Sequence, residues 1–158
     1  MAPLPELIFF DRSGSDEVAA RMQTLAADRT GWVVLDPEAE ADDLEHLPRT
    51  GGLFSGRGPG VPEISWVPGR PGRRGTAPIS VGLRHATGPK VVDRLARYEH
   101  PVPTAWVVRD DSPKRGFVAE LPEGVDQGEV LAWLLRAAEA LTAVRLTGAW
   151  RASVHTYV

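Results

Sequence analysis

The sequence contains no cysteine among its 158 residues. This absence excludes disulfide bonds, thiolate-bound metal centres and catalysis by a cysteine nucleophile. Long apolar runs are missing too, because no stretch reaches the roughly 18 residues that a membrane span needs. The N-terminal stretch lacks the basic and apolar regions of a secretory signal peptide. We therefore expect a cytoplasmic protein with no membrane partner.

Lysine is scarce, with 2 residues against 16 arginines, a bias typical of GC-rich bacterial coding that by itself indicates no function. Hydrophobic residues make up 42% of the chain and charged residues 25%, which is the composition of a globular domain and not of a disordered chain. A chain of this length can bury roughly 70% of its unfolded surface and needs no disulfide bond or structural metal to fold. We predict one domain that spans residues 1–158.

The common catalytic motifs are also absent. The glycine-rich stretches match neither the dinucleotide-binding nor the P-loop pattern, and there is no G-x-S-x-G motif for a serine nucleophile. The four histidines lack the short spacings of metal ligands. We therefore favour a non-catalytic protein without a cofactor, most simply a bacterial-type accessory or regulatory protein that binds another macromolecule.

Hydrophobic periodicity predicts an α/β or α+β domain with about six or seven strands and four helices. Two strand–helix–strand units are expected, at 4–35 and at 79–108, and each is long enough for a crossover between parallel strands. Capping boxes or caps are expected at Ser13, Thr87 and Asp126. The remaining predicted elements are a short acidic helix within 37–48, an edge strand at 61–67, a hairpin strand at 117–121, a helix at 126–145 and a final half-buried strand at 150–158. The expected sheet is mixed, with a parallel portion made by the two units.

The two units resemble each other. Shifting the sequence by 74 positions places 4–36 over 78–110 with seven identities, among them Trp32, Val33 and Val34 over a second W-V-V. One interpretation is an old duplication. The other is that W-V-V simply suits a buried strand.

A polar group follows each predicted strand of these units, which suggests an alternative function. Asp11, Asp36 and Asp110 could hold Mg²⁺ at a shared edge of the sheet, with His85 as acid or base. That arrangement would suit an enzyme acting on a phosphate ester or nucleotide. The candidate anion-binding residues beside it are Ser13, Gly14, Arg84, Thr87, Gly88 and Lys90.

Charge is unevenly distributed along the chain. The net charge of −3 combines −8 over 1–48, +7 over 49–97 and −2 over 98–158. A Gly/Pro/Arg-rich insert at about 49–77 lies in the basic part. It is either a flexible basic arm or lid, or an ordinary pair of exposed loops whose charge is satisfied within the fold.

We predict that this insert contacts a protein partner or a second copy of the chain. The residues expected to make the contact are Arg57, Trp66, Arg70, Arg73 and Arg74. Tryptophan and arginine are common anchors at protein interfaces, provided that they are exposed. Nucleic acid is a third possibility, because arginines neutralise phosphates, but few aromatic residues lie near the cluster.

Overall fold

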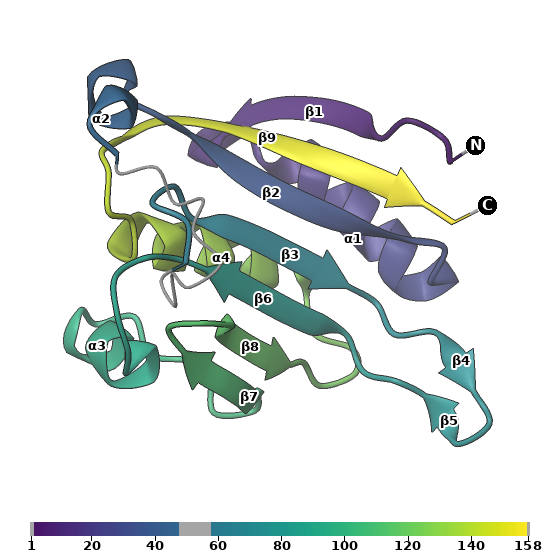
Figure 1. Ribbon diagram of the computed structural model, residues 1–158. Helices are drawn as coiled ribbons and strands as arrows, with labels where there is room; N and C mark the ends of the chain where they lie inside the picture. The colour runs from purple at the N-terminus through teal and green to yellow at the C-terminus, as the bar shows by residue number, and fades with distance from the viewer. Residues whose placement is uncertain (1, 48–57, 158) are drawn as a thin grey trace.

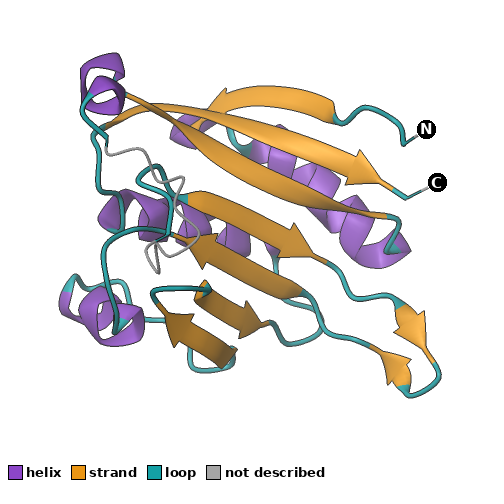
Figure 2. Cartoon of the chain, viewed as in Figure 1, coloured by secondary structure: helices purple, strands orange, loops and turns teal. Residues whose placement is uncertain are grey.

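The computed structural model describes residues 2–47 and 58–157 and has a seven-stranded antiparallel sheet with two helices behind it (Figures 1 and 2). The strands are β1 (Glu6–Asp11), β2 (Gly31–Ala39), β3 (Glu63–Val67), β4 (Pro71–Gly72), β5 (Gly75–Thr76), β6 (Ser80–Arg84), β7 (Val107–Ser112), β8 (Gly116–Glu120) and β9 (Leu146–Thr156). The helices are α1 (Asp16–Asp28), α2 (Ala41–Glu45), α3 (Val91–Arg97) and α4 (Gln127–Ala140). The mixture of α and β elements and the four helices, within the described residues, confirm the coarse prediction.

The predicted parallel portion is wrong. The strand order is β1-β9-β2-β3-β6-β8-β7, and every neighbouring pair is antiparallel. The reason is insertion: β9 lies between β1 and β2, and β8 lies between β6 and β7. The two strands of each unit still run in the same direction, but a strand from elsewhere in the chain separates them.

This insertion preserves part of the expected geometry. Since antiparallel neighbours alternate in direction, β1, β2, β6 and β7 all run the same way and end at one edge of the sheet, on the left in Figure 1. The 74-residue shift also places β1, α1 and β2 approximately over β6, α3 and β7. The two segments therefore have the same succession of strand, helix and strand.

The core lies between the sheet and helices α1 and α4. One side of each central strand is buried, and α1 contributes Val18, Met22 and Leu25 to the same cluster. Helix α4 buries eight of its residues, which explains why its sequence pattern is the strongest in the chain. The predicted cap is confirmed, because the Asp126 side chain accepts a hydrogen bond from the Glu129 backbone nitrogen at 3.0 Å.

Two predicted caps and one strand position need correction. The Ser13 hydroxyl does not cap α1, which begins after Ser15, and Thr87 does not cap α3, which begins after Lys90. The strand predicted at an edge is β3, and it lies in the centre of the sheet between β2 and β6. Its flanking prolines lie outside the hydrogen-bonded ladder, so they are compatible with a central position.

Candidate partner-binding surface

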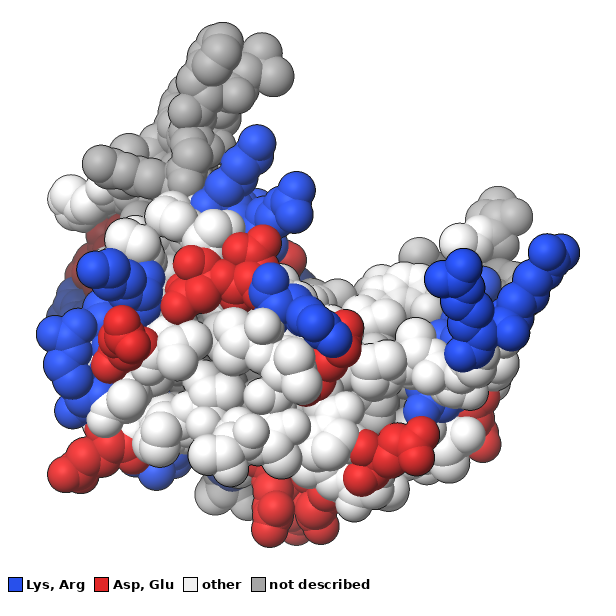
Figure 3. Space-filling view, turned by 90° about the horizontal axis from the view of Figure 1, so that it is seen from below, with Lys and Arg blue, Asp and Glu red and all other residues white. Residues whose placement is uncertain are grey.

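Helices α1 and α4 lie on one face of the sheet, and among residues 2–47 and 58–157 no other helix covers the middle of the opposite face, called the open face below (Figure 1). Its middle row consists of small or β-branched side chains, contributed in order by β9, β2, β3, β6 and β8: Ser153, Val34, Ser65, Gly82 and Val118. Figure 3 shows this face, at the top of the view, as a hollow with cationic side chains at its raised right-hand end and others at its left. The solvent-facing side of an antiparallel sheet is normally polar, and Val34 and Val118 are the apolar side chains of this row.

A cavity of about 610 Å³ lies at one end of the open face, between α2 and strands β1, β9 and β2. Its walls are mainly apolar and include Phe9, Ala39, Leu44, Val61 and Trp150. The Phe9 side chain is 74% exposed and that of Leu44 is 45% exposed, so both project at the rim. The size and lining fall within the range of sites that accept apolar groups.

Helix α2 is held over this cavity by an ion pair. The Asp43 carboxylate accepts hydrogen bonds from the Arg145 backbone nitrogen at 2.7 Å and from its guanidinium at 2.9 Å. The hydrogen bonds from the Arg145 side chain and backbone lower the pKa of Asp43 from 3.8 to about 2. A five-residue helix is not stable in isolation, so this contact sets the position of Leu44.

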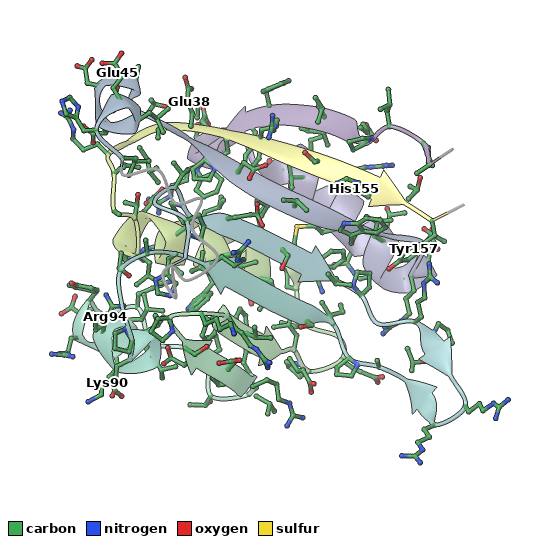
Figure 4. The ribbon with its side chains drawn as sticks, viewed as in Figure 1. Glu38, Glu45, Lys90, Arg94, His155 and Tyr157 are labelled. Carbon is green, nitrogen blue, oxygen red and sulfur yellow. The ribbon has the colours of Figure 1, made fainter. Side chains whose placement is uncertain are left out.

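The cavity end of the open face is acidic. Six carboxylates and no cation occur in residues 36–45. Asp36 pairs with Arg151 at 3.0 Å, and Glu38 accepts a hydrogen bond from Thr147 at 3.1 Å. Within the described part of the chain, Glu40, Asp42 and Glu45 form no ion pair. Figure 4 shows Glu38 and Glu45 pointing outward at this corner, where they favour a cationic group on a bound molecule.

The opposite end carries the β4–β5 hairpin, and its base is anchored. The Arg29 guanidinium donates to the carbonyl oxygens of Gly69 and Ala77 at 2.7 and 2.9 Å. The guanidinium carbon of Arg70 lies 3.5 Å from the centre of the Tyr157 ring, a cation–π contact. These contacts fix the hairpin base, so its arginine tip is presented from a defined position and is not a fully pliable arm.

An aromatic stack continues from that contact across the end of the sheet. Tyr157 lies against Trp32 with 5.1 Å between ring centres, and Trp32 stacks on His155 at 4.7 Å. Figure 4 shows His155 and Tyr157 side by side at the end of β9. The stack ties the basic hairpin to the open face of the sheet.

The residues predicted to contact a partner do not form one surface. Arg73 and Arg74 are exposed at the tip of the hairpin, whereas the Arg70 side chain is engaged with Tyr157. Trp66 is fully buried, and its indole nitrogen donates to Gln127 at 2.9 Å, so it cannot anchor a partner. The prediction for Trp66 is wrong because an apolar strand within a glycine- and proline-rich stretch suggests an exposed position, whereas this strand lies in the centre of the sheet. Arg57 lies outside the described residues.

The alternative magnesium site is not assembled. Asp11 and Asp110 lie on β1 and β7, the two outermost strands, which are six strand spacings or about 29 Å apart. Asp36 lies on β2 between them and pairs with Arg151. These carboxylates cannot coordinate one ion together, since oxygen ligands lie within about 2.6 Å of the metal.

Both predicted anion sites are occupied by carboxylates of the chain itself. Asp11 accepts hydrogen bonds from the Ser13 hydroxyl at 2.6 Å and the Gly14 nitrogen at 2.9 Å, and these two bonds lower its pKa. Asp111 accepts hydrogen bonds from the first two backbone nitrogens of α3. The Ser13 and Gly14 donors and the N-terminal nitrogens of α3 are therefore already used within the fold.

The remaining predicted residues cluster around α3. Arg94 donates to the Thr87 hydroxyl at 3.1 Å and to the Gly88 carbonyl at 2.9 Å, and Lys90 precedes the helix in a left-handed conformation. Figure 4 shows Lys90 and Arg94 at this corner. Arg84, at the end of β6, is exposed and lies opposite Glu63 in the ladder. The Arg94 hydrogen bonds hold the loop that follows β6 against α3.

His85 is buried beside that loop, next to a cavity of about 260 Å³. Its Nδ1 accepts a hydrogen bond from the Thr87 backbone nitrogen at 3.2 Å, which places the ring proton on Nε2. Burial lowers the pKa of His85, the nearby Arg94 charge lowers it further, and Asp111 partly opposes the shift. The Thr87 contact ties the imidazole to the loop after β6, whereas its buried Nε2 has no hydrogen-bond partner among the described residues.

The sequence did not indicate the exposed residues Leu7, Phe9 and Leu44. The apolar run at 4–10 predicts a strand that is buried on both faces, and the edge position of β1 cannot be read from it. Leu44 lies in the predicted acidic helix, and its partial exposure depends on the contact between Asp43 and Arg145, which are 102 positions apart in the sequence.

The chain matches no family model, and no curated protein shows significant similarity to it. Among the described helices, none combines the length and apolar character needed to cross a bilayer.

Proposed function

We propose that this chain is a non-catalytic accessory protein that binds a protein partner through the open face of its sheet. The observation that carries the proposal is the 610 Å³ cavity with Phe9 and Leu44 exposed at its rim. An aromatic or aliphatic side chain of a partner would fill such a cavity as an interface anchor. The cytoplasmic location remains part of the same proposal.

The charge distribution defines the chemistry of that partner. The cavity is flanked by Glu38, Glu40 and Asp42, so the inserted apolar side chain is expected to have lysine or arginine neighbours. Arg73 and Arg74 at the far end favour acidic groups on the same partner. A partner with both features would lie along the hollow of the open face in one orientation.

The internal use of the strand-end carboxylates supports binding over catalysis. Asp11 caps a turn, Asp36 pairs with Arg151, and Asp111 caps α3. Each of these groups has a structural role that its chemistry fully explains. The exposed apolar rim has no such internal role.

The test uses Leu44→Lys, which introduces a cation among the carboxylates and fills the mouth of the cavity. Tyr98→Lys is the matched control, because Tyr98 is 59% exposed and lies after α3, away from the cavity. Each tagged protein is expressed in its native cells, and the captured proteins are identified by mass spectrometry. We expect a specific protein that wild type and Tyr98→Lys retain and Leu44→Lys loses, with unchanged melting temperatures.

Two results would contradict the proposal. The first is an identical set of captured proteins for Leu44→Lys and wild type. The second is capture that disappears after nuclease treatment, which would assign the surface to nucleic acid.

A further inference from the structure

The two outer strands of the sheet differ in how their free edges are protected. Strand β7 has an irregularity between Val108 and Asp110 and carries three consecutive charged residues, Arg109 to Asp111. Bulges and charges are the usual means by which proteins prevent pairing at a sheet edge. Strand β1 pairs with β9 in unbroken register over all six of its residues. Its outer edge therefore offers a regular row of backbone donors and acceptors.

The side chains of β1 are apolar on both faces. Ile8 is buried towards the helices and Phe10 packs against the core, whereas Leu7 and Phe9 lie on the open face with exposures of 49% and 74%. A strand with apolar residues on both faces is normally covered on both faces. Here one face and one edge remain uncovered within the described chain (Figure 1).

We propose that two copies of this chain pair through β1, antiparallel about a twofold axis at Ile8, so that their seven-stranded sheets become one continuous sheet. A twofold interface uses the same surface of both copies, and β1 is suited to it because its sequence is complementary to itself in the antiparallel direction. Phe9 belongs both to this pairing and to the rim of the cavity proposed to bind a protein partner, whereas Leu44 lies at the cavity alone and separates the two proposals.

The pattern of side chains selects the register. Residues directly opposite each other must point to the same face, so a shift by one residue would place open-face residues against core-face residues. With Ile8 opposite the partner's Ile8, Leu7 lies opposite the partner's Phe9, and the two symmetric pairs form an apolar strip on the open face. Aliphatic–aromatic pairs of this kind are favourable between strands.

The same register avoids repulsion at the ends of the strand. Glu6 lies opposite the partner's Phe10, and Asp11 lies opposite the partner's Pro5, so no two carboxylates meet directly. Centring the pair on Phe9 instead would place Leu7 opposite the partner's Asp11. Centring it on Leu7 would place Phe9 opposite the partner's Pro5 and shorten the pairing. The Ile8-centred register has the best apolar overlap of the three.

The first test measures oligomeric state by sedimentation velocity with purified full-length protein. At about 100 µM, a pairing of micromolar Kd keeps most of the wild type dimeric. Leu7→Lys should be monomeric, because it places two ammonium groups in the interface. Val107→Lys is the matched control, since Val107 is 48% exposed on the other outer strand, and it should remain dimeric.

The second test uses the absence of native cysteine. In the Ile8-centred register, position 7 of one copy lies opposite position 9 of the other. The double variant Leu7→Cys/Phe9→Cys therefore has a thiol on both sides of each pair, and oxidised glutathione should convert it to a covalent dimer. Each single variant lacks the opposed thiol and should form several-fold less covalent dimer.

A monomeric wild type, a dimer that Val107→Lys breaks, or equal cross-linking of single and double variants would overturn the β1 pairing. Leu44→Lys separates this inference from the proposed function, because it should lose the captured protein and remain dimeric. A monomeric wild type that still captures a protein through Leu44 would refute the pairing alone.

Discussion

The carboxylate of Asp111 in β7 accepts a hydrogen bond from the backbone nitrogen of Val91, the first residue of α3, at 3.0 Å. Its second oxygen accepts one from Val92 at 3.1 Å. Lys90, the residue that precedes α3 at the N-cap position, provides no side-chain cap. A residue 20 positions away in sequence therefore performs the role that a neighbouring serine or aspartate usually has.

Replacing Asp111 by alanine should destabilise the protein. The substitution leaves two helix-terminal N–H groups without their acceptor and removes a favourable charge at the positive end of the helix dipole, a loss of about 1–2 kcal/mol. Urea unfolding monitored by tryptophan fluorescence measures it. Asp110→Ala is the control, because the carboxylate of Asp110 makes only a 3.9 Å ion pair with exposed Arg115 and should change stability by less than about 0.5 kcal/mol. Equal effects of the two substitutions would contradict the long-range cap.

Much of the secondary structure could be predicted because it depends on local pattern. The apolar face of α4 and its Asp126 cap lie within one continuous segment, and so do the two strands of the β7–β8 hairpin. Strand order could not be predicted, because the position of β9 between β1 and β2 depends on pairing between residues more than 100 positions apart. Hydrophobic periodicity indicates which face of a strand is buried, but it does not indicate which strands lie beside it.

A second prediction concerns the buried hydrogen bond between Trp66 and Gln127. Both residues are buried, the Gln127 oxygen accepts from the indole nitrogen at 2.9 Å, and its nitrogen donates to the Val125 carbonyl at 3.2 Å. Trp66→Phe leaves the amide oxygen unsatisfied, which costs about 1–3 kcal/mol beyond the loss of packing. Adding Gln127→Leu removes the unsatisfied group, so the double variant should lose less stability than the sum of the two single variants. Strict additivity in urea unfolding would show that the bond has no energetic role.

The buried imidazole of His85 predicts a pH dependence. Its pKa lies below the usual 6.5 in the folded state, chiefly because of burial, so below that pH the unfolded chain binds the proton more readily. Stability should therefore fall as the pH decreases from about 6.5 towards the lowered pKa, by at most about 1.4 kcal/mol per pH unit for this group. The pKa of His100 is also lowered by burial and adds to the same trend.

His85→Asn isolates the contribution of His85, because its side-chain oxygen can still accept from the Thr87 nitrogen but the residue does not titrate. Urea unfolding at about pH 5.5 and about pH 7.5 should show a smaller stability difference for this variant than for wild type. A wild-type stability that is constant over this range would contradict the prediction.

The candidate site was less predictable than the fold elements because its features come from distant segments. Strand ends rich in aspartate suggest a metal or phosphate site. In the folded chain, however, Asp11 and Asp111 accept hydrogen bonds from backbone N–H groups. The exposure of Phe9 follows from the edge position of β1, which no local pattern encodes. The charge segregation, in contrast, could be read from the sequence, and it persists as an acidic α2 end and a basic hairpin end.

Charge reversal at the hairpin tip tests whether the basic end contributes to binding. Arg73→Glu/Arg74→Glu changes two exposed residues that form no ion pair with any described residue, so the melting temperature should not fall. Capture of the protein that depends on Leu44 should weaken, and the remaining binding should lose much of its salt dependence because opposite charges no longer meet. Arg70→Glu provides the contrast, since it also removes the contact with Tyr157 and should loosen the hairpin, seen as faster amide hydrogen exchange at 69–77. Unchanged capture by the double variant would restrict the binding surface to the cavity end.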